Sequence, residues 1–255
     1  MRTIELLLLS YLLTGCAFVK RLSGHNSELV HKKKTYIYVD KFGKYILERE
    51  TGSRGKSKDL VVKTRIITND KKKQELERSI TISKKGNLKN KISILRPEIS
   101  QYTAWYDQNK YFSEIKLNPK LKNIQIKMIS PEKKWNGVQQ VKFPIKGNGL
   151  YCFFSQLIEC AKYTGFLSKA LDAKAGQMNF YLLWDGFPYI NNQFEGLEEK
   201  LFVNAKLVYD GETDKELKRF SLIFGSQSIV YLLDDNLSMS EMYWVSQGLS
   251  VRQQY

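Results

Sequence analysis

Histidine, cysteine and proline are all scarce in this chain of 255 residues, which has two, three and five of them respectively. Both histidines, His25 and His31, stand near the N-terminus, and none follows. A Ser-His-Asp or Cys-His nucleophilic centre in a folded core is therefore not expected. A zinc site lacks ligands there, because only Cys152 and Cys160 remain. We predict no catalytic, cofactor-binding or metal site, and no enzyme.

Long hydrophobic runs are also absent after the first residues. The composition is 42% hydrophobic and 26% charged. These proportions are typical of a globular protein with a sizeable core. They exclude a disordered chain, a small disulfide scaffold and a polytopic membrane protein.

The charge is strongly basic and unevenly distributed, with a net charge of +15. Residues 31–150 carry 29 Lys and Arg against 11 Asp and Glu, whereas residues 151–255 carry 9 against 13. Such a basic half indicates either an acidic partner or a solvated, lysine-rich surface. Most of the basic residues are Lys, whereas nucleic-acid readers favour Arg. We therefore expect anionic lipid or an envelope polymer as the partner, and no nucleic acid.

The N-terminus reads as a targeting segment. The apolar run of residues 6–13 is much shorter than the about 20 residues of a membrane-spanning helix. It ends at Leu13-Thr14-Gly15-Cys16, which resembles the lipobox of bacterial lipoproteins. The resemblance implies a signal peptide over residues 1–15 and covalent diacylglyceryl and acyl groups on Cys16. The alternative is a buried N-terminal strand in which Cys16 is an ordinary thiol.

The lipoprotein resemblance also implies a location. The protein would be exported and anchored in a membrane by its acyl chains. Ala17 follows the cysteine instead of the Asp typical of inner-membrane retention, which favours the periplasmic face of the outer membrane if the cell is Gram-negative. Residues 16–34 show no periodicity and are predicted to be a lipidated tether.

From residue 35 onward most of the chain has the period of β-strands. Ile124, Ile126 and Met128 alternate with polar residues, as do alternate residues from Leu201 to Tyr209. Ile80 and Ile82 flank Thr81 in the same way. Turn signals between these runs predict an antiparallel meander.

The period changes to that of helices in the middle of the chain. Apolar residues from Leu150 to Ala161 have the spacing of one helical face, and a second helical piece runs from Phe166 to Ala175. Cys152 and Cys160 would lie about 12 Å apart within one helix, too far for a disulfide. They are therefore either free buried thiols, or a disulfide if the helix begins after Cys152.

The order of elements predicts a mainly antiparallel β fold with a central helix, of the α+β class. We expect residues 35–255 to form a single β-rich domain, with a helical segment at about 150–175 inside a curved sheet or half-barrel. This order resembles the Lol-type periplasmic half-barrel carriers and related domains of unknown function. The resemblance implies a cavity between sheet and helix that holds acyl chains.

Aromatic residues cluster in two places, which leaves two interpretations. Tyr102, Trp105 and Tyr111 lie around one predicted hairpin, and Trp184 and Phe187 lie around a turn. They pack in the core and turns, or they line the rim of an apolar pocket.

Two functions are compatible with these features. The first is an envelope lipoprotein that acts in envelope assembly or maintenance by binding a protein or an anionic polymer. The alternative is a membrane-anchored binding module for a lipid or another apolar ligand.

Overall fold

The computed structural model describes residues 30–56, 58–88, 91–118, 123–143 and 149–254. The predicted signal peptide, the lipidation site Cys16 and most of the tether lie outside these residues. Among the described residues, no helix is both long and apolar enough to cross a membrane.

One continuous sheet of fifteen strands dominates the described residues, in the order β8-β7-β6-β5-β4-β3-β2-β1-β15-β14-β13-β12-β11-β10-β9. We call β1–β8 the N-terminal arm and β9–β15 the C-terminal arm. The strands of the N-terminal arm are β1 Val30–Asp40, β2 Tyr45–Arg54, β3 Asp59–Thr68, β4 Glu75–Asn87, β5 Ser93–Tyr106, β6 Asn109–Asn118, β7 Asn123–Ile129 and β8 Gly137–Lys142.

The C-terminal arm combines strands with the short helices of the molecule. Its strands are β9 Tyr151–Phe153, β10 Gln177–Leu183, β11 Phe202–Glu212, β12 Lys218–Phe224, β13 Gln227–Leu233, β14 Met239–Trp244 and β15 Leu249–Gln254. The α-helices are α2 Leu157–Tyr163, α3 Phe166–Ala173 and α4 Tyr189–Gln193. Short 3-10 turns are η1 Lys133–Trp135, η2 Phe154–Gln156 and η3 Val245–Gln247.

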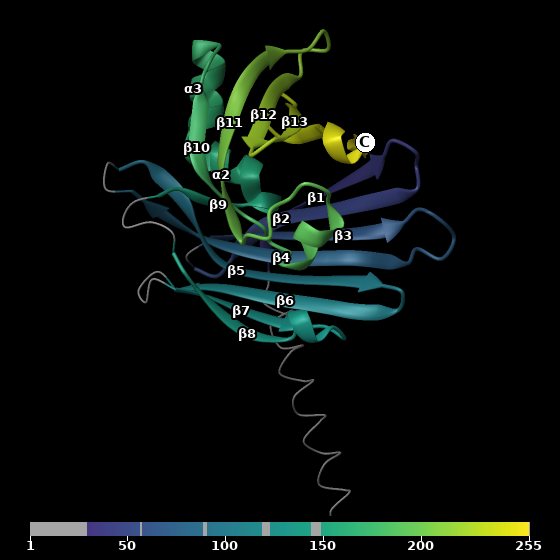
Figure 1. Ribbon diagram of the computed structural model, residues 1–255. Helices are drawn as coiled ribbons and strands as arrows, with labels where there is room; N and C mark the ends of the chain where they lie inside the picture. The colour runs from purple at the N-terminus through teal and green to yellow at the C-terminus, as the bar shows by residue number, and fades with distance from the viewer. Residues whose placement is uncertain (1–29, 57, 89–90, 119–122, 144–148, 255) are drawn as a thin grey trace, which may run out of the picture.

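The two arms are joined along β1 and β15, which pair from Ile37↔Gln254 to Asp40↔Val251. Neighbouring strands in the described chain are antiparallel, except β9 and β10, which are parallel. The outer strands β8 and β9 do not pair within the described chain. Instead, Ile115 and Ile126 of the N-terminal arm share a core cluster with Phe153 and Leu183 of the C-terminal arm. The sheet therefore curves into an open, barrel-like form, as Figure 1 shows.

The structure thus confirms the expected fold class, a curved and mainly antiparallel sheet with few helices. The alternation in β7 is also confirmed, because Ile124, Ile126 and Met128 are buried between more exposed polar residues. In β11, Ala205 and Leu207 are buried in the same way.

Strand β4 differs from what the position of its isoleucines suggests. Ser79, Thr81 and Ser83 are buried and form the face that bonds to interior residues, while on the other face Ile80 is only partly buried and Ile82 is buried. These hydroxyls are tolerated inside because each has a hydrogen-bond partner. The inner face of this strand is therefore polar.

The predicted helix over residues 150–161 begins later than its apolar spacing suggests. Residues 151–153 form β9, which pairs with β10, and η2 follows before α2 begins at Leu157. Strand pairing therefore overrides helical periodicity at Tyr151, Cys152 and Phe153. The second helical piece is present as α3.

The centre of the molecule is aromatic. Trp184 and Trp244 lie parallel, with ring centroids 6.4 Å apart, and both are buried. Phe154 and Phe224 pack against both indoles. Phe224 lies in β12, Trp244 in β14 and Phe154 in η2, and Trp184 directly follows β10. These four rings therefore pack the interior of the C-terminal arm.

Candidate functional site

A cavity of about 510 Å³ lies between the two arms. It runs along the inner faces of β1 and β2 and reaches β14 and β15 on the other side. Its wall is mainly apolar and aromatic. The apolar lining comprises Tyr36, Tyr38, Tyr45, Leu47, Ile66, Tyr102, Phe154, Leu157, Ile158, Ile190, Phe194, Tyr231, Leu237, Met239, Met242, Trp244, Leu249 and Val251.

Strand alternation places these side chains in the cavity. Leu47 lines it, whereas its neighbour Ile46 does not, because successive residues of β2 point to opposite faces of the sheet. Tyr36 and Tyr38 of β1 line it through the same alternation, and the Tyr38 hydroxyl donates to the Met239 carbonyl at 3.0 Å. That bond ties β1 to β14 across the cavity.

An ion pair crosses one wall of the cavity. Arg49 of β2 lies 2.7 Å from the Glu159 carboxylate of α2 and also donates to the Ser155 carbonyl at 2.8 Å. Burial alone would lower the pKa of Arg49, but the Glu159 carboxylate outweighs it and raises this pKa. The pair therefore fastens α2 to the N-terminal arm and leaves no free charge at Arg49.

The segment 184–194 crosses the interior and carries a buried carboxyl at Asp185. The Ser155 amide donates to Asp185 Oδ2 at 3.0 Å, and the Ser100 hydroxyl donates to the Asp185 carbonyl at 2.9 Å. Asp185 Oδ1 has no hydrogen-bond partner among the described residues. Burial raises the pKa of Asp185 to about 6, although the hydrogen bonds from Ser155 act to lower it.

Glu77 of β4 is a second carboxyl in the cavity wall. Gln193 of α4 donates to it at 3.2 Å and to the Tyr102 hydroxyl at 3.3 Å. Burial raises the pKa of Glu77. Close packing holds the crossing segment here, since a Cβ on Gly186 would lie only 3.0 Å from the Tyr102 ring.

Cys152 and Cys160 form a disulfide, with their Cα atoms 6.1 Å apart. Of the two arrangements left open by the sequence, the structure has the one in which the helix begins after Cys152. The bond links β9 to α2, the helix that contributes Leu157, Ile158 and Glu159 to the cavity wall. It therefore helps to position this part of the cavity wall.

The expected aromatic clusters divide between core and cavity. Tyr111 and Tyr189 are buried with Tyr102 in a separate core cluster, and Tyr102 also lines the cavity. Phe187 packs against the core. Arg49 and Asp185 were not predicted as site residues, because nothing in their local sequence marks them.

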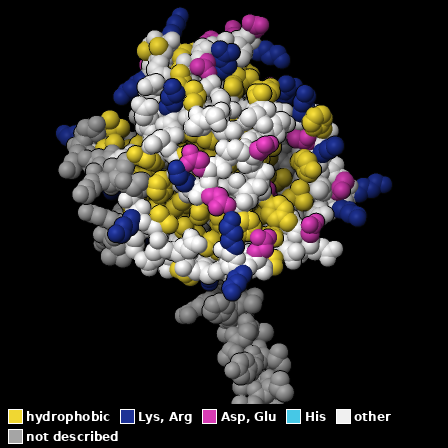
Figure 2. All heavy atoms as spheres, viewed as in Figure 1, with side chains coloured by type: hydrophobic (Ala, Val, Ile, Leu, Met, Phe, Trp, Pro, Cys, Tyr) yellow, Lys and Arg dark blue, Asp and Glu magenta, His cyan; other side chains and the backbone are white. Residues whose placement is uncertain are grey.

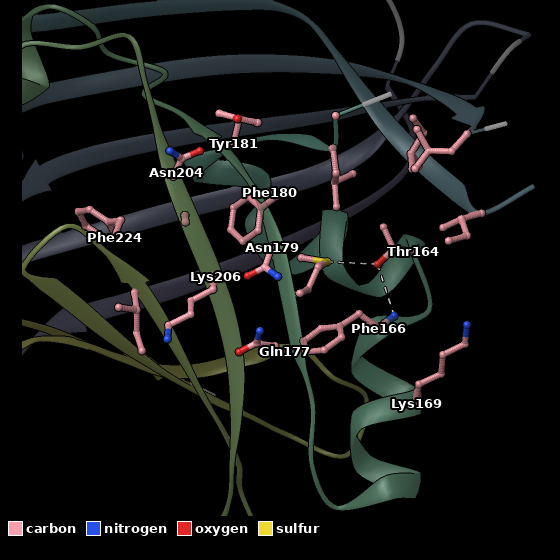
Figure 3. A pocket seen from close by; sticks show the side chains of 18 of the residues that line it. Thr164, Phe166, Lys169, Gln177, Asn179, Phe180, Tyr181, Asn204, Lys206 and Phe224 are labelled. Atoms are coloured by element: carbon pink, nitrogen blue, oxygen red, sulfur yellow. Dashed lines mark hydrogen bonds between the residues drawn. The ribbon is translucent and has the colours of Figure 1, made fainter. Parts of the chain in front are cut away.

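A second hollow, a groove of about 940 Å³, runs along the outside of β10 and α3 (Figure 3). Phe166 and Phe180 line it together with polar side chains such as Asn179 and Lys206. It is open and mixed in chemistry, and residues 89–90 and 144–148, which adjoin its lining in the sequence, lie outside the described chain. The cavity between the arms, which is less open and more apolar, is therefore the stronger candidate site.

Comparison with protein families and with curated proteins finds no match. Among solved structures, the chain is similar to the crystal structure of a beta-barrel-like protein of the domain of unknown function DUF1849 from Brucella abortus. The TM-score is 0.44 and the sequence identity 11%, and the similarity covers 89% of this chain and 96% of that chain.

Proposed function

We propose that the protein is a binding module that holds an elongated apolar ligand, such as an acyl chain, in the cavity between its two arms. The observation that carries this proposal is the partly enclosed, mainly apolar cavity of about 510 Å³. Ligand sites are typically clefts of about 300–1,000 Å³, lined by hydrophobic and aromatic side chains with a few polar groups. This cavity has that size and that lining.

The buried charged groups of the cavity wall favour a neutral ligand over an anionic one, whereas the cations Lys34 and Lys162 line it with exposed side chains. Arg49 is already paired with Glu159, so it does not offer a free cation. Asp185 and Glu77 have no ion-pair partner among the described residues, and burial raises the pKa of both. A carboxylate brought near them would be repelled, whereas a hydroxyl could donate to them. The ligand we propose is therefore a long-chain alcohol or a similar neutral lipid.

The location of this activity follows from the sequence and remains a proposal. We place the protein on a bacterial membrane, exported and held by acyl groups on Cys16, at the periplasmic face of an outer membrane if there is one. A lipid-binding cavity on a lipid-anchored protein would lie next to its source of ligand. The role in envelope assembly through a protein or polymer partner stays a prediction, and no contact in the described chain favours it.

A matched pair of variants tests the proposed cavity. Leu47→Trp places a larger ring in the cavity, whereas Ile46→Trp adds the same group to the opposite face of the same strand. The measurement is displacement of the neutral fluorescent probe N-phenyl-1-naphthylamine by a long-chain alcohol, with the full chain. We expect Leu47→Trp to weaken both probe and alcohol binding about tenfold or more, and Ile46→Trp to bind like the wild type.

The proposal fails if the wild type binds neither compound, or if the two variants behave alike. Circular dichroism of both variants is the control for folding. Displacement by the carboxylate of the same chain length is the control for charge. We expect this carboxylate to be the weaker competitor at neutral pH.

A further inference from the structure

Two hairpin tips of the N-terminal arm form one projecting surface. The turn between β1 and β2 and the turn between β3 and β4 lie side by side, because the Asn69 amide group donates to the Gly43 carbonyl at 2.9 Å. The Asn69 backbone N–H also donates to the Lys44 carbonyl at 2.7 Å. Both tips project on the right of Figure 1, and Figure 2 shows Lys and Arg side chains standing out along this edge.

A highly exposed aromatic residue stands among the lysines of this surface. Phe42, at the tip of the first hairpin, is 70% exposed. The ammonium groups of Lys41 and Lys44 lie 5.7 Å and 6.0 Å from the centre of its ring. We call the exposed residues of the two tips the lysine rim: Lys41, Phe42, Lys44, Lys71, Lys72 and Lys73.

The acidic residues beside the lysine rim are occupied by their own turns. Asp40 accepts the N–H groups of Phe42 and Tyr45. Asp70 accepts hydrogen bonds from the Thr68 hydroxyl and from the backbone N–H groups of Lys72 and Lys73. These bonds lower the pKa of Asp70. These carboxylates stabilise the turns, and the five lysines of the rim outnumber them, so the two tips carry a net positive charge.

The lysines of the rim form no ion pair with a carboxylate in the described chain, unlike several lysines on the strands. The Lys73 ammonium group donates to the Asn69 side-chain oxygen. On the strands of the same arm, by contrast, Lys63, Lys84 and Lys116 each pair with a glutamate. The five lysines of the two adjoining tips therefore form a local cluster of positive charge.

The lysine rim is continuous with the cavity. Asp40 and Tyr45, which flank the first tip, line the cavity wall, and the Tyr45 side chain is also exposed at the surface. A ligand that leaves the cavity at this end therefore passes beside Phe42 and the lysines around it.

We propose that the lysine rim docks on an anionic lipid bilayer, with Phe42 inserted among the headgroups and the adjoining end of the cavity facing the membrane. Clustered lysines are attracted by anionic leaflets, and an exposed aromatic ring is stabilised at the membrane interface. An anionic polymer would satisfy the lysines but gives no role to Phe42. Docking does not require the cavity to hold a lipid. Membrane docking and ligand binding in the cavity can therefore be tested independently.

The test follows the environment of Phe42 with a polarity-sensitive fluorophore attached at Phe42→Cys, in the full chain. All variants also carry Cys16→Ser, which removes the one cysteine outside the Cys152–Cys160 disulfide. The control label is at Asp235→Cys, which is exposed in the turn between β13 and β14. Vesicles of phosphatidylcholine with phosphatidylglycerol are compared with vesicles of phosphatidylcholine alone.

We expect emission at position 42 to rise several-fold with the anionic vesicles only, while emission at position 235 stays constant. The combined change Lys71→Gln, Lys72→Gln and Lys73→Gln should raise the lipid concentration for half-maximal emission about 100-fold. A combined change of the same charge in the C-terminal arm, Lys169→Gln, Lys174→Gln and Lys215→Gln, should raise it at most about threefold. The cavity variant Leu47→Trp should leave the rise at position 42 intact.

Four outcomes would overturn the proposal. The first is an equal response at both labels, and the second is an equal effect of the two sets of lysine changes. The third is the same rise with heparin in place of vesicles, which would assign the surface to an anionic polymer. The fourth is loss of the rise in Leu47→Trp, which would mean that the label reports filling of the cavity and not docking.

Discussion

The two arms of the sheet differ in what fills the space they enclose. The C-terminal arm has a closely packed hydrophobic core, in which Leu207, Phe220, Leu222 and Ile229 are fully buried. Facing it, the N-terminal arm presents the partly buried Leu47 and other side chains that line a cavity.

The difference arises from the chemistry of the inner faces. In the C-terminal arm, large apolar side chains meet across the strands and exclude space. In the N-terminal arm, β4 and β5 turn hydroxyl groups inward, and these bond to η2 and to the crossing segment, as Thr81 does with Ser155 and Ser100 does with Asp185. Polar groups held at hydrogen-bond distance fix the interior without filling it. The C-terminal arm therefore provides a packed core and much of the apolar cavity wall, and the N-terminal arm completes that wall with Leu47 and the polar side chains of β4.

The largest predicted effect contrasts one truncation in each arm. Phe220→Ala removes a fully buried ring from the packed arm, and we expect it to lower the free energy of unfolding by about 3–5 kcal/mol. Leu47→Ala only enlarges an existing cavity, so we expect a loss of about 1 kcal/mol. Urea denaturation of both variants measures the two losses. Equal losses would show that the N-terminal arm is packed as tightly as the C-terminal arm.

A smaller effect is expected from Asp185, which fastens the crossing segment to η2. Its pKa is raised from 3.8 to about 6 in the folded protein, so the folded state keeps a proton that the unfolded state loses. Its contribution to stability is therefore greatest below about pH 4 and is lost as the pH rises to about 6, by about 2–3 kcal/mol at most.

The variant Asp185→Asn isolates this contribution. Its amide oxygen can accept the Ser155 N–H without a charge, so the variant should lack this part of the pH dependence. The measurement is the free energy of unfolding from pH 4 to pH 7 for both proteins. The interpretation is wrong if the difference between them does not change with pH.

The smallest effect compares the two stacked indoles. Trp244 Nε1 donates to Gln227 Oε1 at 2.9 Å, whereas Trp184 Nε1 has no partner within the described chain. Trp244→Phe removes one of the hydrogen bonds that the Gln227 side-chain oxygen accepts. Trp184→Phe, by contrast, removes a buried donor that has no acceptor. We expect Trp244→Phe to be the less stable variant by about 1 kcal/mol in thermal unfolding. The reverse order would contradict the assigned hydrogen bonds.

How far the sequence predicts this fold depends on the range of the interactions. Ile124, Ile126 and Met128 reveal β7 because strand alternation is local. The alternation of Ser79, Thr81 and Ser83 is equally regular, but apolar periodicity indicates the opposite face of β4, which carries the isoleucines. The strand at Tyr151–Phe153 depends on pairing with β10, far along the chain, so its local helical spacing is misleading.

The candidate site was less predictable than the fold. Arg49 and Glu159 are 110 residues apart in the sequence, and Asp185 gains its significance only from burial beside Ser155. The basic half is visible in the composition, but which of its lysines are paired depends on glutamates across the strands, as for Lys63 with Glu50 and Lys84 with Glu98. Such pairings are properties of strand register, which the sequence alone does not give.

The most direct measurement of the central claim is mass spectrometry of an organic extract from the protein purified from its native compartment. The extract of the wild type is compared with those of Leu47→Trp and Ile46→Trp. The account predicts a neutral lipid in about equimolar amount from the wild type and from Ile46→Trp, and its loss from Leu47→Trp. An extract of the folded wild type that contains no lipid, or equal lipid in all three proteins, would contradict it.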